Sequence, residues 1–596
     1  MKRRLIQAMV LTSALAVTAP VAAVGRRVVF VDSGRSGGTG TFDRPFATLA
    51  EAQRGSNISD VIFLAEASTP YEENIVLKKG QMLIGSAFGL DALRTETSIE
   101  IDAPPIPAAQ GSGPVIHGTI SLAGDNVVAG CTIFADKQTG VALSAQSPDG
   151  PITLRAMVVR TANDAYGLYI DNNAFAVSWT GGRLDALDHG SGILINGGNG
   201  NITIDHVPIA GDFGTAIAVS RRSGGTIVFR NGSPIKIGGA SREAITLTDS
   251  RGSVTFDSPL QIKTNGGRGL IVNRVDRVAV LAGASWIETT NGTALDVRHS
   301  DVNMVYEHIC AEGAAPGRLT EAIIADQVRG RLEITEGTIR NALSYAMRLT
   351  QSTDVHVRKL DVSGGGTVAA REECPEDIAA QTNVRCRAAL YLRHIERSSF
   401  ENITITDNAG VGVNANNLTD VSFADVRIMR TGDRQSEPAL LLDEARGAIS
   451  FTRCSFIDGG GGGVVIEQRF NKARVTFDRC EIAAPERPTA AAKLFQARVG
   501  GSAMLDLQLL NAHVHDNAAS GVSVQAKGSG SVILTVRGSH FDRLGSTALE
   551  LVLGDAATGC IDAADAEAVR QNNGGVLVAI DPRATYGIGP CDSFRP

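Results

Sequence analysis

The chain has 596 residues, of which 66 are glycine, 5% are aromatic and 20% are charged. Its 56 Lys and Arg residues against 63 Asp and Glu residues give a formal net charge of −7, so it lacks the basic excess that binding to a nucleic-acid backbone requires. Its hydrophobic content of 43% excludes a disordered chain, and length alone predicts several domains.

The first segment has the features of an export signal. Basic residues 2–4 precede an apolar run from Leu5 to Val17, and small residues lead up to Ala23. This pattern predicts a signal peptide over residues 1–23 and a secreted protein, either periplasmic or at the cell surface. The sequence contains no other long apolar run, so we expect no membrane-spanning helix.

Export makes disulfides permissible, and all eight cysteines follow the predicted signal peptide. Cys374 and Cys386 lie in one polar stretch, and we expect them to close a loop. Cys560 and Cys591 flank the last segment, and we expect them to tie down the C-terminus.

Two further cysteines occupy equivalent positions in a repeated pattern. Cys454 and Cys480 each follow an arginine, in Phe-Thr-Arg-Cys and Phe-Asp-Arg-Cys. They could be stacked thiols or a third bridge. No Cys-x-x-Cys occurs, so we expect no structural zinc site.

A short phrase recurs along most of the chain: a small residue, then two apolar residues separated by one other residue. Early copies lie 24–28 residues apart. The copies begin at Gly140, Gly167, Gly192, Ala216, Ala244, Gly269, Ala294, Ala322, Ala346, Ala389, Gly410, Ala439, Gly463, Gly521 and Ala548.

A second alternating segment follows many copies after about ten residues, as at Ile202–Ile204, Ile227–Phe229 and Val475–Phe477. Strands this short cannot bury an apolar face alone, but coils stacked about 4.8 Å apart can. Leucine-rich repeats would need a helix in each repeat, and propeller blades need about 40 residues. The period therefore predicts an all-β parallel β-helix of about 16–19 coils.

These repeats make the chain resemble the right-handed parallel β-helix proteins of the pectate-lyase-like superfamily. The segments Val29–Asp32, Arg44–Leu49, Asp60–Leu64 and Gly80–Gly85 are similar to the N-terminal cap of exported and surface bacterial β-helix proteins. The resemblance implies a right-handed solenoid whose first open coil is covered by a short helix at Phe46–Gln53.

A continuous repeat replaces the several domains that length predicts. We expect a signal peptide (1–23), an N-terminal cap with the first coils (24–110), the parallel β-helix (111–556) and a C-terminal cap segment (557–596).

Many β-helix enzymes act on acidic polysaccharides through carboxylates, and one stretch contains suitable residues. Ile202–His206 loosely resembles a pectate-lyase Trp-Ile-Asp-His signature, but without the tryptophan. Asp and Asn recur at matching turn positions of other coils, so turn formation is the favoured interpretation, and we assign no catalytic residue, metal or cofactor. The candidates for acid–base chemistry or Ca²⁺ binding are Asp185, Asp188, His189, Asp205, His206 and Asp212.

The residue two places after the small landmark should point outward, and it is often apolar. If exposed, these residues would form a strip along the helix axis, which is typical of an interaction surface. The alternative is that loops such as Gly364–Arg387 cover the strip. Its members are Tyr169, Leu194, Ile271, Ile324, Tyr391, Leu441 and Val465.

From these features we expect an exported, non-catalytic β-helix whose extended surface binds a polysaccharide or another cell-envelope partner, like an adhesin or scaffold. The alternative is a polysaccharide lyase or glycoside hydrolase acting on an acidic polysaccharide near residues 185–212. A third interpretation is a structural piece of a larger envelope assembly. The sequence sets no oligomeric state.

Overall fold

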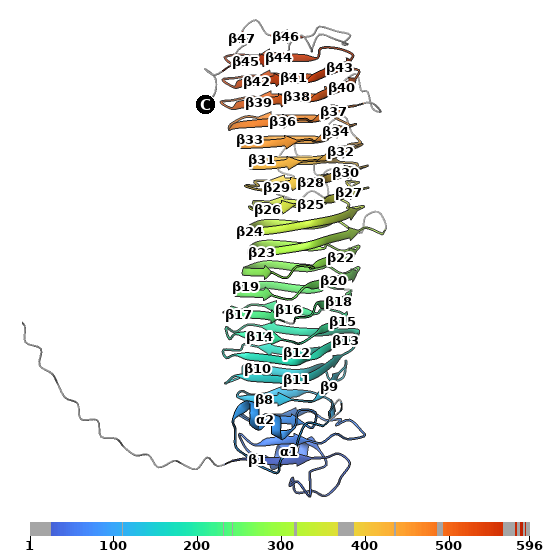
Figure 1. Ribbon diagram of the computed structural model, residues 1–596, viewed down its shortest axis with the longest axis vertical. Helices are drawn as coiled ribbons and strands as arrows, with labels where there is room; N and C mark the ends of the chain where they lie inside the picture. The colour runs from blue at the N-terminus through green and yellow to red at the C-terminus, as the bar shows by residue number, and fades with distance from the viewer. Residues whose placement is uncertain are drawn as a thin grey trace, which may run out of the picture.

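The strands stack one above another along a single tall column, from β1 near one end to β46 and β47 at the other (Figure 1). The computed structural model describes residues 25–109, 111, 113–230, 232–240, 242–314, 319–367, 387–433, 437–484, 493–563, 578–580, 585–587 and 591. The predicted signal peptide and the expected Cys374–Cys386 bridge lie outside the described residues.

The described strands fall into three runs along the chain. The first run is β1 (Arg26–Val31), β2 (Val61–Leu64), β3 (Ile75–Val76), β4 (Met82–Gly85), β5 (Ile101–Asp102), β6 (Val115–His117), β7 (Ile120–Leu122), β8 (Asn126–Ala129), β9 (Thr132–Ala135), β10 (Val141–Gln146), β11 (Ile152–Thr161), β12 (Tyr166–Asp171), β13 (Val177–Asn196), β14 (Ile202–Asp205), β15 (Ile209–Phe213) and β16 (Ile217–Ser220). The second run is β17 (Ser223–Arg230), β18 (Ile235–Ala240), β19 (Ile245–Phe256), β20 (Leu260–Asn265), β21 (Leu270–Val280), β22 (Trp286–Thr290), β23 (Leu295–Glu312), β24 (Glu321–Arg340), β25 (Tyr345–Thr350), β26 (Val355–Val357), β27 (Leu360–Ser363), β28 (Ala388–Arg393), β29 (Ser399–Glu401), β30 (Ile403–Thr406), β31 (Val411–Ala424) and β32 (Arg427–Met429). The third run is β33 (Leu440–Thr452), β34 (Ser455–Ile457), β35 (Val464–Gln468), β36 (Lys472–Asp478), β37 (Glu481–Ala483), β38 (Phe495–Val499), β39 (Met504–Leu510), β40 (His513–Asn517), β41 (Val522–Ala526), β42 (Ser531–Arg537), β43 (His540–Leu544), β44 (Leu549–Leu553), β45 (Thr558–Ala563), β46 (Val578–Ile580) and β47 (Thr585–Gly587).

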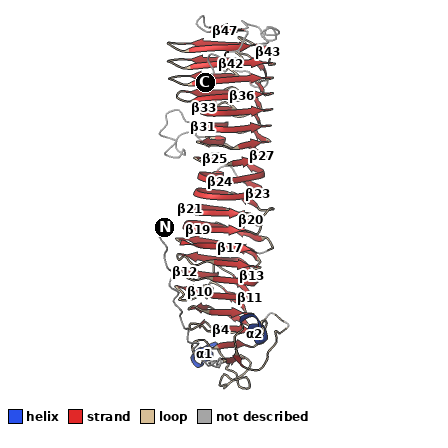
Figure 2. Ribbon diagram, turned by 60° about the vertical axis from the view of Figure 1, so that its left-hand side comes forward, coloured by secondary structure: helices blue, strands red, loops and turns tan. Residues whose placement is uncertain are grey.

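Each coil contributes three strands, and each strand pairs in parallel with its equivalents in the neighbouring coils. The first strand carries the repeated phrase, as in β12, β16 and β41, and the second is the alternating segment found in the sequence, as in β14. The third strand, as in β15, β20, β22 and β40, was not recognised in the sequence. Long strands such as β13 bend at the corners of the coil, so one strand supplies two or three of the strand positions. The ladder makes about 16 turns, and strands on either side of the expected boundaries pair with each other, as β4 does with β8 and β42 with β45. Figure 2 shows strands at almost every level of the column.

A short helix lies near the first strands and overlaps the helix predicted at Phe46–Gln53. Helix α1 (Leu49–Gly55) begins with a capping box between Thr48 and Glu51, and it buries Leu49 and Ala52 in the main core. It starts three residues later than predicted because Phe46 is engaged in a β-bridge with Val31.

A second helix, α2 (Leu90–Thr97), lies against the outside of the first coils. Its Leu90 and Leu93 are fully buried against an apolar outer face that includes Phe30, Phe63 and Met82. This helix was not expected from the sequence. None of the described helices has the length and apolarity needed to cross a membrane.

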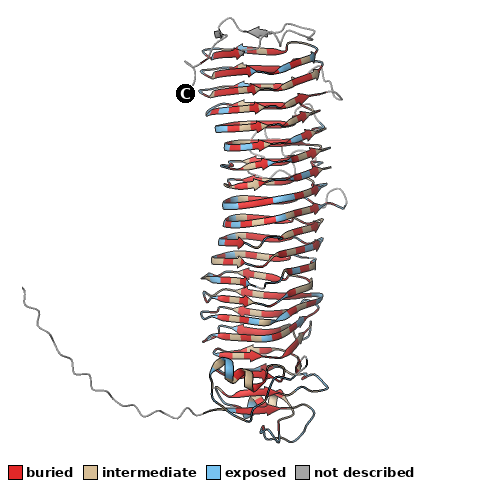
Figure 3. Ribbon diagram, viewed as in Figure 1, coloured by how far each residue is buried: buried red, intermediate tan, exposed pale blue. Residues whose placement is uncertain are grey.

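Alternation of buried and exposed residues along each strand places one continuous apolar core inside the column (Figure 3). Equivalent side chains stack from coil to coil on the second strands. The rings of Phe400, Phe423, Phe451 and Phe477 follow one another with centroids 5.1, 4.8 and 4.7 Å apart. This spacing matches the distance between hydrogen-bonded strands, so the ladder register itself builds the aromatic stack.

The described cysteines follow two of the sequence predictions. A disulfide joins Cys560 and Cys591, whose Cα atoms lie 6.2 Å apart, and fastens the C-terminal segment. Cys454 and Cys480 are free, buried thiols in neighbouring coils, so the bridge considered for them is wrong and the stacked arrangement is right. Each lies directly after a left-handed corner residue, where the coil turns into its third strand.

Candidate functional site

Asp185 and Asp212 lie on third strands, whereas the other four candidates lie at two different corners of the column. Asp188 and His189 have positive φ values of 45° and 60°, in the turn between a third strand and the next first strand. Asn163 and Asp164 have positive φ in the preceding coil, and they donate backbone hydrogen bonds to the carbonyls of Asp188 and His189. These residues are therefore turn formers.

Asp205 and His206 lie at the corner between the second and third strands. His206 has φ 54° and is followed by the buried Val207, as Arg453 and Arg479 are followed by the two buried cysteines. Its ring is 72% exposed, and its Nδ1 lies 2.9 Å from Oδ1 of the neighbouring Asp205. The position is a recurring corner of the coil.

The six candidates do not converge. His189 Nδ1 lies 3.3 Å from Asp212 Oδ1, whereas Asp185 Oδ2 is paired with Arg183 Nε at 2.8 Å. Within the described part of the chain, no ion pair or hydrogen bond joins these pairs to Asp205 or to each other. The six side chains therefore do not form one cluster in the described structure.

The seven strip residues do share one outward column on the first strands. Ile271 pairs with Asp296, Asp296 with Ile324, and Ile324 with Arg348. The column therefore exists in the predicted register, but polar side chains interrupt its apolar members. Arg348 is itself held by two hydrogen bonds to Glu321, at 2.7 and 3.1 Å.

The prediction that the strip is exposed is wrong for five of its members. Ile271, Ile324, Tyr391, Leu441 and Val465 are between 3% and 8% exposed. The remaining two, Tyr169 and Leu194, are half-buried. The strip is therefore buried for most of its length, and residues 368–386 of the loop that was expected to cover it lie outside the described residues.

A buried ion pair lies beside the covered part of the strip. Arg387 donates to both carboxylate oxygens of Glu437, at 2.9 and 3.0 Å, and also to the carbonyl of Gly366. Burial raises the pKa of the Glu437 carboxyl although the guanidinium opposes it. The pair joins residues 50 positions apart in the chain, and Arg387 directly precedes Ala388, which packs in one cluster with Tyr391 and Leu441.

The third-strand face, defined as the outward side of the third strands, carries an aromatic platform instead. Trp286 on β22 and His308 on β23 stack with ring centroids 5.6 Å apart and planes inclined by 6°. They belong to a column that runs from Lys236 through Gln261 to both rings and on to Glu336. Both rings are half-buried.

A polar hollow of about 360 Å³ lies beside this platform. Lys263 and Glu288, which are paired in the ladder, form an ion pair at its lining with 3.5 Å between Nζ and Oε2, and Glu288 also lies 3.5 Å from His308. Burial raises the pKa of the Cys310 thiol at its floor. The side chains that give it its character are Lys263, Glu288, Thr290, Glu312, Thr338 and Arg340.

Two more observations set the platform apart. A larger hollow, of about 530 Å³, lies at the corner between first and second strands, where Asp276, His299 and Arg329 line it without a Trp, Tyr or Phe among its described lining residues. The other tryptophan, Trp179, is fully buried in the core and donates from Nε1 to the Gly181 carbonyl. Trp286 was missed in the sequence because the third strand was missed. Its only signal is the alternation in Trp-Ile-Glu-Thr-Thr at residues 286–290.

Comparison with known families agrees with this architecture. Residues 321–487 match the family model described as a right handed beta helix region. The described ladder continues the same coil on both sides of that segment, so the chain is a right-handed parallel β-helix, consistent with the pectate-lyase-like superfamily. Comparisons with curated proteins and with solved structures find no match.

Proposed function

We propose that the chain is an exported, non-catalytic β-helix that binds an extended glycan along its third-strand face. The observation that carries the proposal is the stacked pair Trp286–His308 beside the polar hollow. Sugar rings pack their C–H faces on aromatic rings, while their hydroxyls bond to carboxylates, hydroxyls and guanidinium groups. The platform supplies the first kind of contact and the hollow the second.

The length of the face also fits a polymer. Lys236, Gln261, Trp286, His308 and Glu336 occupy one column in five successive coils. At about 4.8 Å per coil, this column spans roughly 19 Å, which is enough for several sugar units. A protein or lipid partner would instead favour an apolar surface, whereas five of the seven apolar residues described on the first-strand column are buried.

The electrostatics favour binding over catalysis. Lys359 Nζ lies 2.6 Å from Glu336 Oε1 and lowers the pKa of that carboxyl. Lys263 Nζ also lies 3.5 Å from Glu288 Oε2. The Glu336 carboxyl is thus held in its ionised form, whereas a lyase or hydrolase needs a group that can hand over a proton.

A glycan array with neutral and acidic oligosaccharides tests the proposal. The full chain should retain at least one class of extended glycan, and Trp286→Ala should weaken binding about 10-fold, equivalent to roughly 1.4 kcal/mol. The matched control is Phe470→Ala, because Phe470 is 73% exposed at another corner of the column. That variant should bind like the parent.

Two results would count against the proposal. Equal loss in both variants, or in neither, would remove the platform from the binding site. Release of unsaturated or reducing sugar ends from a polyuronate by the parent chain would establish the lyase or hydrolase alternative instead.

A further inference from the structure

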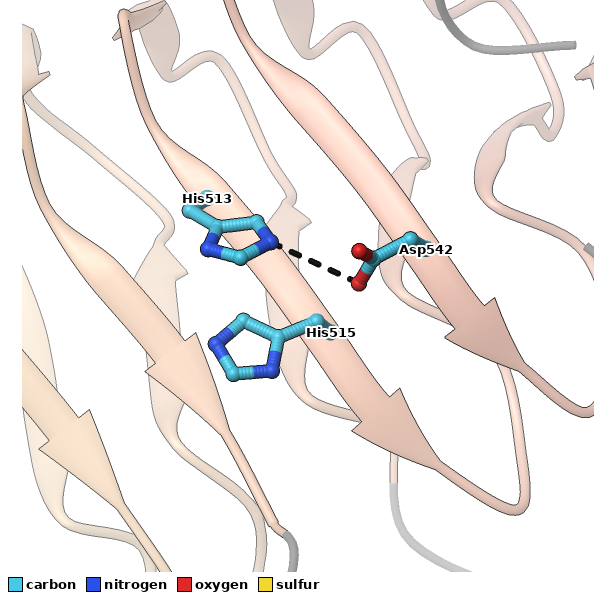
Figure 4. Close-up of side chains that lie close together, drawn as sticks. All are labelled: His513, His515 and Asp542. Atoms are coloured by element: carbon cyan, nitrogen blue, oxygen red, sulfur yellow. Dashed lines mark ion pairs between the residues drawn. The ribbon is translucent and has the colours of Figure 1, made fainter. Parts of the chain in front are cut away.

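Two histidines and an aspartate converge on the third-strand face close to the C-terminal end of the column (Figure 4). His513 and His515 both point outward from β40, and Asp542 faces them from β43 in the next coil. One donor atom from each of the three lies within 4.8 Å of the other two. Among the described residues, this is the one group of three or more such side chains with that geometry.

The spacing of the donors suits a small divalent ion. His513 Nε2 lies 3.4 Å from Asp542 Oδ1, which is long for a hydrogen bond. In a tetrahedral zinc site, with bonds of about 2.0–2.2 Å, two donors lie about 3.3–3.5 Å apart. Asp542 Oδ1 is also a buried oxygen without a hydrogen-bond partner. A cation between the two atoms would satisfy both.

Carboxylates beside His515 fix the orientation of its ring. Its Nδ1 lies 2.7 Å from Asp516 Oδ2, and its Nε2 lies 3.2 Å from Glu481 Oε1. An ion would take the place of one of these carboxylates at its ring nitrogen, while the other carboxylate fixes the ring and raises the basicity of the ligating nitrogen, as in many histidine–metal sites. The His515 ring is 10% exposed and stacks 3.9 Å from the His513 ring, so its position is well defined.

The charge balance leaves room for a dication, with one competitor. Glu481, Asp516 and Asp542 contribute three negative charges, and Arg543 contributes one positive charge. Arg543 lies 3.1 Å from Asp542 Oδ2 and 3.2 Å from His515 Nδ1, and it also pairs with Asp516. Its side chain is 57% exposed, so it can turn away while keeping solvent contact.

We propose that His513, His515 and Asp542 form a binding site for Zn²⁺ or a similar first-row divalent ion. Two imidazoles and one carboxylate are the donor set that such ions prefer, whereas Ca²⁺ prefers oxygen donors alone. Water completes the coordination. Because the ligands come from two stacked coils, the ion fastens one coil to the next near the C-terminal end of the solenoid.

Isothermal titration of chelator-treated full chain with Zn²⁺ tests the site. The parent should bind one equivalent of Zn²⁺, and His513→Gln and Asp542→Asn should each lower the affinity for Zn²⁺ by about 10-fold or more. Arg543→Gln should strengthen binding, because it removes the competing charge. His206→Gln is the matched control, since its ring is 72% exposed on another corner.

A second readout separates binding from folding. Zn²⁺ should raise the melting temperature of the parent and of His206→Gln, but not that of His513→Gln, and Ca²⁺ should raise none of them. Co²⁺ should give the visible absorption of a tetrahedral complex in the parent but not in His513→Gln. Titrations that are identical in the parent, His513→Gln and Asp542→Asn, or no uptake by the parent at all, would overturn the proposal.

Discussion

Truncating Leu441 tests whether the outward column of the first strands is packed or open. Leu441 is 8% exposed and clusters with Tyr391, Val411 and Val465. Leu441→Ala removes three carbon atoms, worth about 0.8 kcal/mol each on transfer, and leaves a cavity. We therefore expect a loss of about 2–4 kcal/mol in the free energy of unfolding of the coils around it.

The matched control is Leu194→Ala in the same column, because Leu194 is half-buried. Its loss should be about half as large. A solenoid is stabilised mainly between neighbouring repeats, so the effect should be local rather than shared by the whole column.

Hydrogen exchange followed by mass spectrometry measures this local stability. Peptides from β28, β31, β33 and β35 should exchange about 30- to nearly 1,000-fold faster in Leu441→Ala, at tenfold per 1.4 kcal/mol. Peptides near β12 should not change. Unchanged protection from exchange around Leu441 would refute the claim that Leu441 is packed and would indicate an exposed strip instead.

Two further predictions concern the C-terminal half. Cys454 and Cys480 are 2% and 1% exposed and unbridged. Alkylation should therefore leave both unmodified in the native chain and modify both after unfolding without reductant. Recovery of a Cys454–Cys480 disulfide peptide would contradict this. The Arg543 guanidinium strongly lowers the pKa of the Asp516 carboxyl. The ion pair therefore stabilises the fold fully above the ordinary aspartate pKa of about 3.9. That contribution is lost as the pH falls below this value toward the lowered pKa of the folded state. The melting temperature should fall between about pH 4 and pH 2, and less steeply in Asp516→Asn; equal slopes would argue against the pair.

The repeat could be predicted because the first and second strands carry regular landmarks. The small residue, such as Gly192, recurs where the coil has little room: an added Cβ there would lie 2.1 Å from the Ala216 carbonyl oxygen. The phenylalanine of the second strand recurs because it stacks on its equivalents. The third strand lacks such a landmark, since its outward residues vary from lysine to tryptophan along the column.

The sites were harder to predict, for a physical reason in each case. The outward direction of Leu441 follows from strand alternation, but its burial depends on packing with Tyr391, Val411 and Val465 from other coils. Trp286 and His308 are 22 positions apart in the sequence, and His513 and Asp542 are 29 apart. Only the register of the ladder brings each pair together, and the length of each turn sets that register.

Tryptophan fluorescence tests the central claim most directly, because the chain has two tryptophans and one of them, Trp179, is fully buried. A change in emission on adding a bound oligosaccharide therefore reports on Trp286. The account predicts a blue shift and protection from acrylamide quenching, with the same midpoint as binding on the array, and no such change in Trp286→Phe. Saturable glycan binding that leaves the emission and quenching of the parent chain unchanged would contradict it.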